Sequence, residues 1–203
     1  MTTLLTPTID AAPAGAALHA LARLLEYPDA NFSTHCAAAP GAGAVALAAL
    51  EPAEREELYT AAFDVTPACV PYVSIHLFGE ENFKRAEFMA ALQARYAEVG
   101  FDPAGELPDH IAVLARFAAQ AGEEERRELA EFCLLHPLER MIGSLREGHP
   151  YRTVLSDLRD TFRAAYPDLV AAPSPREQML HHGAGCQGCA AVHEHDTEEA
   201  PSA

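Results

Sequence analysis

The feature that most constrains the fold is an amphipathic segment in the middle of the chain, residues 80–99. Phe88, Leu92, Tyr96 and Val99 recur there at intervals of three or four positions, a spacing that places them on one face of an α-helix. Gly100 follows and predicts the end of this helix, because glycine readily adopts the left-handed conformation of a helix C-cap. A helix with a single apolar face has to bury that face, so other elements must pack against it.

The remainder of the chain shows the same helical spacing, interrupted by proline and glycine. Apolar residues make up 49% of it, alanine is abundant, and the alternating runs of β-branched residues that favour strands are scarce. We therefore expect an all-α protein with a single compact helical domain. Besides residues 80–99, helices are expected over residues 14–26, 44–50, 51–63, 107–121, 123–145 and 151–166.

The helical pattern is less clear in three places. Residues 31–43 are rich in small side chains and are expected to form a loop. Residues 70–78 are apolar but short, so periodicity does not distinguish a buried extended segment from a buried helix. Pro137 lies within an apolar helical pattern and is expected to kink or restart that helix, because proline lacks the backbone N–H.

The two ends of the chain differ from its middle. Residues 1–13 are expected to be disordered, residues 14–182 to form the helical domain with a hinge near residues 100–110, and residues 183–203 to form a flexible tail rich in Cys, His and acidic residues. No apolar run approaches the ~18 residues that a membrane span needs. The first residues have neither the basic region nor the apolar core of a secretory signal. We therefore expect a cytoplasmic protein.

The charge of the chain limits its partners. Thirty acidic residues face fourteen basic ones, for a formal net charge of −16. Such a protein repels the phosphates of nucleic acid and attracts basic peptides. The charge alone also fits a simpler interpretation, in which it keeps an alanine-rich protein soluble.

The tail contains a cluster of side chains that bind metals. Cys186, Cys189, His193 and His195 lie within ten residues of one another, and zinc prefers four such ligands in a tetrahedral arrangement. The spacing differs from that of a zinc finger, which separates its two ligand pairs by about a dozen residues. The alternatives are a transient thiol contact and a disordered polar tail without a ligand.

A second group of polar residues precedes the helix expected at residues 107–121. Glu106, Asp109 and His110 fit the ordinary preference of a helix N-terminus for acidic and capping residues. Exposed, the same groups would bind a peptide or a nucleotide, and a carboxylate beside a histidine also suits acid–base catalysis. The sequence has no phosphate-binding glycine loop, no dinucleotide fingerprint and no metalloprotease motif, so the spacing alone favours an ordinary helix start.

Three stretches, in this order and at this spacing, resemble the TorD/DmsD/NarJ family of cytoplasmic chaperones for molybdenum enzymes. They are LARLLEYPDANF, YVSIHLFGEENFKRAEFMAALQARYAEVGFD and ELPDHIAVLARFAA, and the similarity covers residues 18–165. The middle stretch is most similar to the chaperones of type II DMSO reductase-family enzymes. The resemblance implies an all-helical, non-catalytic protein that binds the N-terminal twin-arginine leader of an apo catalytic subunit and supports molybdenum cofactor insertion before export.

The resemblance also implies a site at the hinge between two helical halves, where the family has an acidic residue beside a histidine. The peptide-binding residues expected on this basis are Tyr72, His76, Phe78, Glu106, Asp109 and His110. The resemblance implies that no cofactor is required. Weak guanine nucleotide binding, a transient contact with the molybdopterin cofactor, and zinc in the tail are all compatible with the resemblance. The partner would be the apo molybdoenzyme, with no nucleic acid and no stable membrane association, and the chaperone a monomer or a domain-swapped dimer.

Two other functions remain open at the sequence level. The first is a metal-binding or metal-handling protein that acts through its Cys/His tail. The second is a helical scaffold or an enzyme subunit without a ligand of its own.

Overall fold

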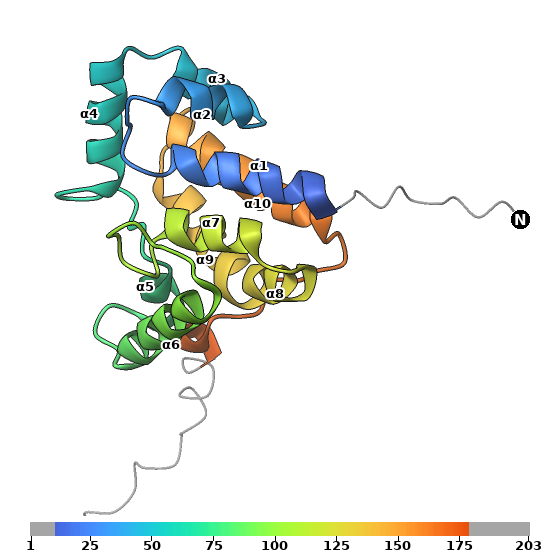
Figure 1. Ribbon diagram of the computed structural model, residues 1–203. Helices are drawn as coiled ribbons and strands as arrows, with labels where there is room; N and C mark the ends of the chain where they lie inside the picture. The colour runs from blue at the N-terminus through green and yellow to red at the C-terminus, as the bar shows by residue number, and fades with distance from the viewer. Residues whose placement is uncertain (1–10, 179–203) are drawn as a thin grey trace, which may run out of the picture.

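The computed structural model describes residues 11–178, which contain ten α-helices, one π-helix and a single helical turn at residues 175–178 (Figure 1). No strand occurs among these residues, so the all-α prediction is confirmed for this part of the chain. The helices are α1 (Ala11–Leu24), α2 (Phe32–Ala38), α3 (Ala42–Ala48), α4 (Pro52–Phe63), α5 (Val73–Phe78), α6 (Lys84–Val99), α7 (Ile111–Gln120), α8 (Glu123–Glu128), η1 (Leu129–Leu134), α9 (Leu135–Ser144) and α10 (Pro150–Ala165).

Two groups of helices meet along α1 and α7, the pair with the most extensive contact. On one side, α1 and α10 pack with α2 and α3, while α4 stands beside them (Figure 1). On the other side, α7 and α9 pack with α5, α6, α8 and η1. One continuous apolar core runs through both groups. None of the helices within residues 11–178 combines the length and apolar character needed to cross a lipid bilayer.

The amphipathic segment expected at residues 80–99 forms α6, although its first turn begins four residues later, at Lys84. The side chain of Asn82 ends the preceding turn: its Oδ1 accepts a hydrogen bond from the Lys84 N–H at 3.0 Å. Leu92 and Tyr96 are buried as expected and Phe88 is partly buried, but Val99 at the end of the helix is exposed. Gly100 caps the helix at φ 70°, a left-handed conformation that favours glycine. The local signals of this helix were therefore sufficient to predict it.

The prediction of a loop at residues 31–43 was wrong. The structure has α2 at Phe32–Ala38 and the start of α3 at Ala42, with Pro40 and Gly41 forming the break between them. Phe32 and Cys36 are one helical turn apart and both buried, so packing stabilises a helix that the small residues alone do not specify. At the N-terminus, α1 begins at Ala11 and so includes three residues of the segment expected to be disordered; residues 1–10 lie outside the described part.

The α-helix restarts near Pro137, as expected: α9 begins at Leu135, and Pro137 lies in its first turn. Helices α8, η1 and α9 follow one another without a gap, and the six-residue π-helix Leu129–Leu134 lies just before the proline. The Leu135 N–H bonds the carbonyl of Ala130, five residues earlier, as a π-helix requires. The carbonyl of Glu131, within the π-helix, accepts a hydrogen bond from the Ala172 N–H at 3.0 Å. The C-terminal segment is thereby attached to the π-helix.

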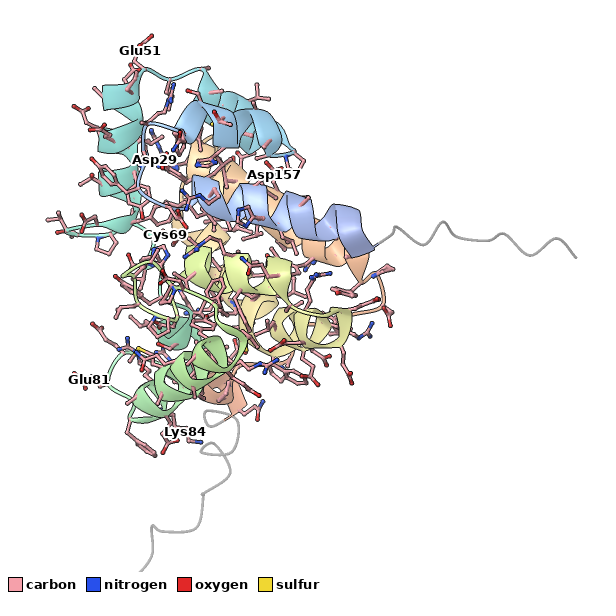
Figure 2. The ribbon with its side chains drawn as sticks, viewed as in Figure 1. Asp29, Glu51, Cys69, Glu81, Lys84 and Asp157 are labelled. Carbon is pink, nitrogen blue, oxygen red and sulfur yellow. The ribbon has the colours of Figure 1, made fainter. Side chains whose placement is uncertain are left out.

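Helices α3 and α10 pack closely against each other. A Cβ at Gly43 would lie 2.6 Å from the backbone nitrogen and Cγ2 of Val154, so only glycine allows the two helices to approach this closely. Asp157 of α10 lies beside α3, and its Oδ2 accepts a hydrogen bond from the Gly43 N–H at 2.9 Å (Figure 2).

Candidate functional site

A cavity of about 250 Å³ lies at the N-terminus of α7, where the two groups of helices meet. Its wall combines the residues that follow α1, one tyrosine of α4, the loop before α7 and the first turns of α7. The residues that line it are Glu26, Tyr27, Tyr59, Pro103, Ala104, Glu106, His110, Ala112, Val113 and Arg116. Two carboxylates, two tyrosines and a histidine are therefore brought together from segments far apart in the sequence.

His110 is the N-cap of α7 and is 4% exposed. Its Nδ1 accepts a hydrogen bond from the Ala112 N–H at 3.2 Å, so the remaining proton of the neutral ring is on Nε2. Burial lowers the pKa of His110 below its usual value, while Glu106 and Asp109 oppose that shift. The ring thus lines the cavity in its neutral form, with an Nε2–H for which the described residues provide no acceptor.

Asp109 is fully buried and does not line the cavity. Its Oδ2 accepts hydrogen bonds from the backbone N–H of Ser74 at 3.3 Å and from the Ser74 hydroxyl at 2.5 Å. Ser74 lies in the first turn of α5, so the carboxylate stabilises the N-terminus of a helix distant in sequence. The Ser74 Oγ in turn accepts a hydrogen bond from Arg85 Nε at 3.0 Å. Asp109 therefore positions α5 and does not offer its carboxylate to solvent.

Tyr72 connects α5 to the histidine of the cavity. An isolated antiparallel bridge pairs Tyr72 with His110, through the Val73 N–H to the Asp109 carbonyl and the Ile111 N–H to the Pro71 carbonyl, both at 2.9 Å. The Tyr72 ring contacts the His110 ring edge-on, with centroids 5.7 Å apart. Burial and the neighbouring Glu106 raise the pKa of Tyr72. The phenol is accordingly an uncharged hydrogen-bonding group at neutral pH.

An open hollow of about 590 Å³ adjoins the cavity and shares Tyr27 with it. The hollow lies along α4 and the loop after it, and Glu56, Glu57 and Asp64 line it together with Val65. Within residues 11–178 none of these three carboxylates forms a salt bridge with a basic side chain. The sequence explains this, because residues 56–83 contain five acidic residues and no Lys or Arg.

Val65 has an unusual conformation at the edge of this hollow. Its φ is 52°, a left-handed conformation that is strained for a β-branched residue, and it is 85% exposed. The Asp64 Oδ1 accepts a hydrogen bond from the Val65 N–H at 2.7 Å and stabilises the turn. Tyr27 is also exposed, so the hollow combines acidic groups with accessible apolar surface.

The structure brings together four of the six expected peptide-binding residues, Tyr72, Glu106, Asp109 and His110, and separates the other two from them. The His76 Nε2 is 2.8 Å from the carbonyl of Val70, and burial lowers the pKa of this histidine. The Phe78 ring packs against Phe88 of α6, with centroids 5.7 Å apart. Neither residue lines the cavity or the hollow, and neither contacts the cavity histidine as Tyr72 does. A peptide-binding role for all six residues stays a prediction.

The four expected zinc ligands, Cys186, Cys189, His193 and His195, lie outside the described residues. Between residues 11 and 178, no group of three or more His, Cys, Asp and Glu side chains is placed to hold a metal ion. The free cysteines in this part are dispersed, and burial raises the pKa of the Cys69 and Cys133 thiols to about 11. These thiols are consequently poor metal ligands and poor nucleophiles at neutral pH.

Sequence reasoning missed Glu26, Tyr27, Tyr59 and Arg116. Glu26 and Tyr27 belong to the chain turn after α1. Asp29, two residues after Tyr27, marks the position of this turn near α1 and α4 (Figure 2). The Tyr27 and Tyr59 rings meet edge-on at 5.4 Å. The only signal was the Tyr27-Pro28-Asp29 break itself, because it places a large aromatic residue where a helix ends and a chain turn exposes it.

Comparison with known families identifies the chain. The profile of the family described as nitrate reductase delta subunit matches residues 10–147, which is more than half of the sequence. The chain belongs to this family. Members of the nitrate reductase delta subunit family are assembly chaperones that act with molybdoenzyme catalytic subunits, so the general role of the chain is that of a chaperone. A search of curated proteins found no match. The matched region includes the whole cavity and the hollow, and it ends before α10.

Proposed function

We propose that this protein is the dedicated cytoplasmic chaperone of one DMSO reductase-family molybdoenzyme. It binds the N-terminal twin-arginine leader region of the apo catalytic subunit and holds that subunit while the molybdenum cofactor is inserted, before export or assembly. It binds its client and catalyses no reaction. The observation that carries the proposal is the acidic, aromatic cavity at the N-terminus of α7, continuous through Tyr27 with the acidic hollow along α4.

The cavity suits a guanidinium group. Glu106 is exposed and forms no salt bridge within residues 11–178, so its carboxylate is available for a charge-assisted pair with arginine. The rings of Tyr27 and Tyr59 add aromatic surface on which a planar cation can stack. These groups recognise one arginine side chain without any further change in the fold.

The hollow suits the residues beside that arginine. Its carboxylates, Glu56, Glu57 and Asp64, attract a second cation, and Val65 and Tyr27 offer apolar contact to the hydrophobic part of a leader. Binding of this kind weakens with added salt, because the carboxylates are near the surface and ions screen them. The same charge disfavours nucleic acid and the anionic surface of a membrane.

The cavity does not fit a phosphate-bearing group. Of the described residues that line it, Arg116 is the only Lys or Arg, and it is paired with Glu26. A guanine nucleotide or the molybdopterin cofactor would place phosphates beside Glu26 and Glu106, which repel them. We therefore propose that the cofactor passes to the client without a site in this cavity. The chaperone acts as a monomer or a domain-swapped dimer.

Calorimetric titration of the full chain with a synthetic peptide of the client's N-terminal region tests the proposal. We expect binding that weakens when the paired arginines are replaced by alanine. Glu106→Gln should lower the affinity, while Glu147→Gln, which removes the same charge from the exposed α9–α10 loop, should leave it within about twofold. Equal effects of the two variants would show that the peptide does not bind in the cavity. Failure of the wild-type protein to bind the peptide would reject the proposed function.

The Cys/His tail supports a second candidate function, metal binding or metal handling. The observation in favour of it is the presence of Cys186, Cys189, His193 and His195 within ten residues. Zinc titration of the full chain against a variant that ends at His182 tests it. Loss of one tight zinc equivalent in the shortened protein supports a tail site. Unchanged client binding by the same variant would show that the tail is separate from the chaperone site.

A further inference from the structure

The cavity contains a cation of the chaperone itself. Arg116, two turns into α7, places its Nε 2.8 Å from Oε1 of Glu26, and its side chain is only 11% exposed. Among the described residues this Nε–H finds no aligned hydrogen-bond acceptor, so the contact with Glu26 is an ion pair by distance alone. The Arg116 guanidinium therefore neutralises the Glu26 carboxylate without the aligned, bidentate hydrogen bonds that make an arginine–carboxylate pair strong.

Arg116 is also held from the other side. Its Nη1 and Nη2 donate to the carbonyls of Asp102 and Pro103, at 3.4 and 3.2 Å, and its guanidinium lies over the Phe101 ring, 5.3 Å from the centroid. These contacts do not involve Glu26. The Arg116 side chain can therefore lose its contact with Glu26 and keep its contacts with the loop before α7.

Glu26 is likewise shared. It follows α1 and forms a second ion pair with Arg23, through its other oxygen, and Arg23 is not among the residues that line the cavity. The cavity also holds the Nε2–H of the buried His110, which has no acceptor among the described residues. A guanidinium that enters from the cavity would thus compete with Arg116 for Glu26 and would meet Glu106 on its other edge.

We propose that Arg116 is an internal competitor of the client's arginine. It neutralises Glu26 in the free chaperone and releases this carboxylate when a guanidinium of the client enters the cavity. This inference rests on the proposed function. Its consequence is a preference for arginine: a planar guanidinium can donate to Oε1 of Glu26 and to Glu106 from two of its edges, whereas a lysine ammonium is a compact point charge without such a fork.

The test compares two substitutions that each remove one positive charge from Glu26. Affinities are measured for a peptide with two adjacent arginines followed by an apolar stretch, and for the same peptide with two lysines. Arg116→Gln is expected to raise the affinity for the arginine peptide at least threefold and to reduce the preference for arginine over lysine. Arg23→Gln, the matched control outside the cavity, is expected to change affinity less than twofold. Equal gains from both variants would mean that net charge alone acts, and would overturn the proposal.

A double-mutant cycle separates this inference from the proposed function. In the Glu26→Gln protein, Arg116→Gln should give no further gain, because the contested carboxylate is absent. If Arg116→Gln fails to fold by circular dichroism, Arg116→Lys serves in its place with a smaller expected gain, since lysine loses the planar contact with Phe101. A wild-type protein that binds neither peptide rejects the proposed function together with the inference. A wild-type protein that binds, and a variant that binds no tighter, rejects the inference alone.

Discussion

Asp109 allows the sharpest test of how the site is built. Its carboxylate is fully buried and holds the first turn of α5 through Ser74, so Asp109→Ala removes two hydrogen bonds to a charged acceptor and leaves a hydroxyl and an N–H without a partner. Hydrogen bonds to charged groups contribute about 1.5–3 kcal/mol each. One of the two is long, at 3.3 Å, and the Asp109 Oδ1 has no hydrogen-bond partner within residues 11–178, which offsets part of the gain.

We therefore expect Asp109→Ala to lower the free energy of unfolding by about 2–3 kcal/mol. For a protein of this size this corresponds to a fall in Tm of about 4–12 °C. Urea unfolding followed by circular dichroism measures the first quantity, and thermal melting measures the second. Asp109→Asn keeps a carbonyl acceptor for Ser74 and should lose less.

A double-mutant cycle with Ser74→Ala shows whether the loss comes from this contact. If it does, adding Ser74→Ala to the Asp109→Ala protein should produce little further destabilisation, because the two residues act as a pair. A loss below about 0.5 kcal/mol for Asp109→Ala would refute the reasoning. So would full additivity of the two substitutions, since it would show that Asp109 does not act through α5.

Two further predictions concern the histidine cap and the C-terminal segment. The lowered pKa of His110 keeps its ring neutral in the folded protein, so the unfolded chain takes up a proton first as pH falls. The free energy of unfolding therefore decreases below about pH 6.5, by about 1.4 kcal/mol for each unit by which the folded and unfolded pKa values differ. His110→Asn keeps a capping acceptor, and its melting temperature should change less between pH 7.5 and 5.5; an unchanged slope would contradict this. Ala172→Pro removes the N–H that bonds Glu131 and should cost about 1 kcal/mol in urea unfolding. Val170→Pro, at an exposed position whose N–H is unbonded within the described residues, is its control, and equal losses would argue against the attachment.

The parts of the fold that sequence predicted are those whose signals are local. Helix α6 has its apolar face, its length and its Gly100 cap within one stretch of sequence, so each signal supports the others. Helix α2 lacks such support, since Phe32 and Cys36 are separated by small polar residues and the following Pro40-Gly41 suggests a loop. Burial against α1 and α3 decides that segment, and burial is not visible in its own sequence.

The site was predictable in part for the same reason. Glu106 and His110 are close in sequence, and the resemblance added Tyr72, which the bridge to His110 places beside them. Glu26 follows α1 and Tyr59 lies in α4, and only the packing of the helices brings them to the same cavity. Asp109 shows the opposite error: a residue next to a cavity histidine in sequence is turned away from the cavity to cap α5.

The central claim is that the chain binds the apo form of a molybdoenzyme through the acidic cavity, and one affinity capture tests it most directly. Wild-type and Glu106→Gln proteins serve as baits in native cytoplasm, with mass spectrometry of the eluates and a molybdenum assay of the captured protein. The account predicts that the wild-type bait captures a molybdoenzyme catalytic subunit that lacks its cofactor and retains its uncleaved N-terminal leader, and that the variant captures less of it. Capture of only the mature, cofactor-loaded enzyme, or equal capture by both baits, would contradict the account.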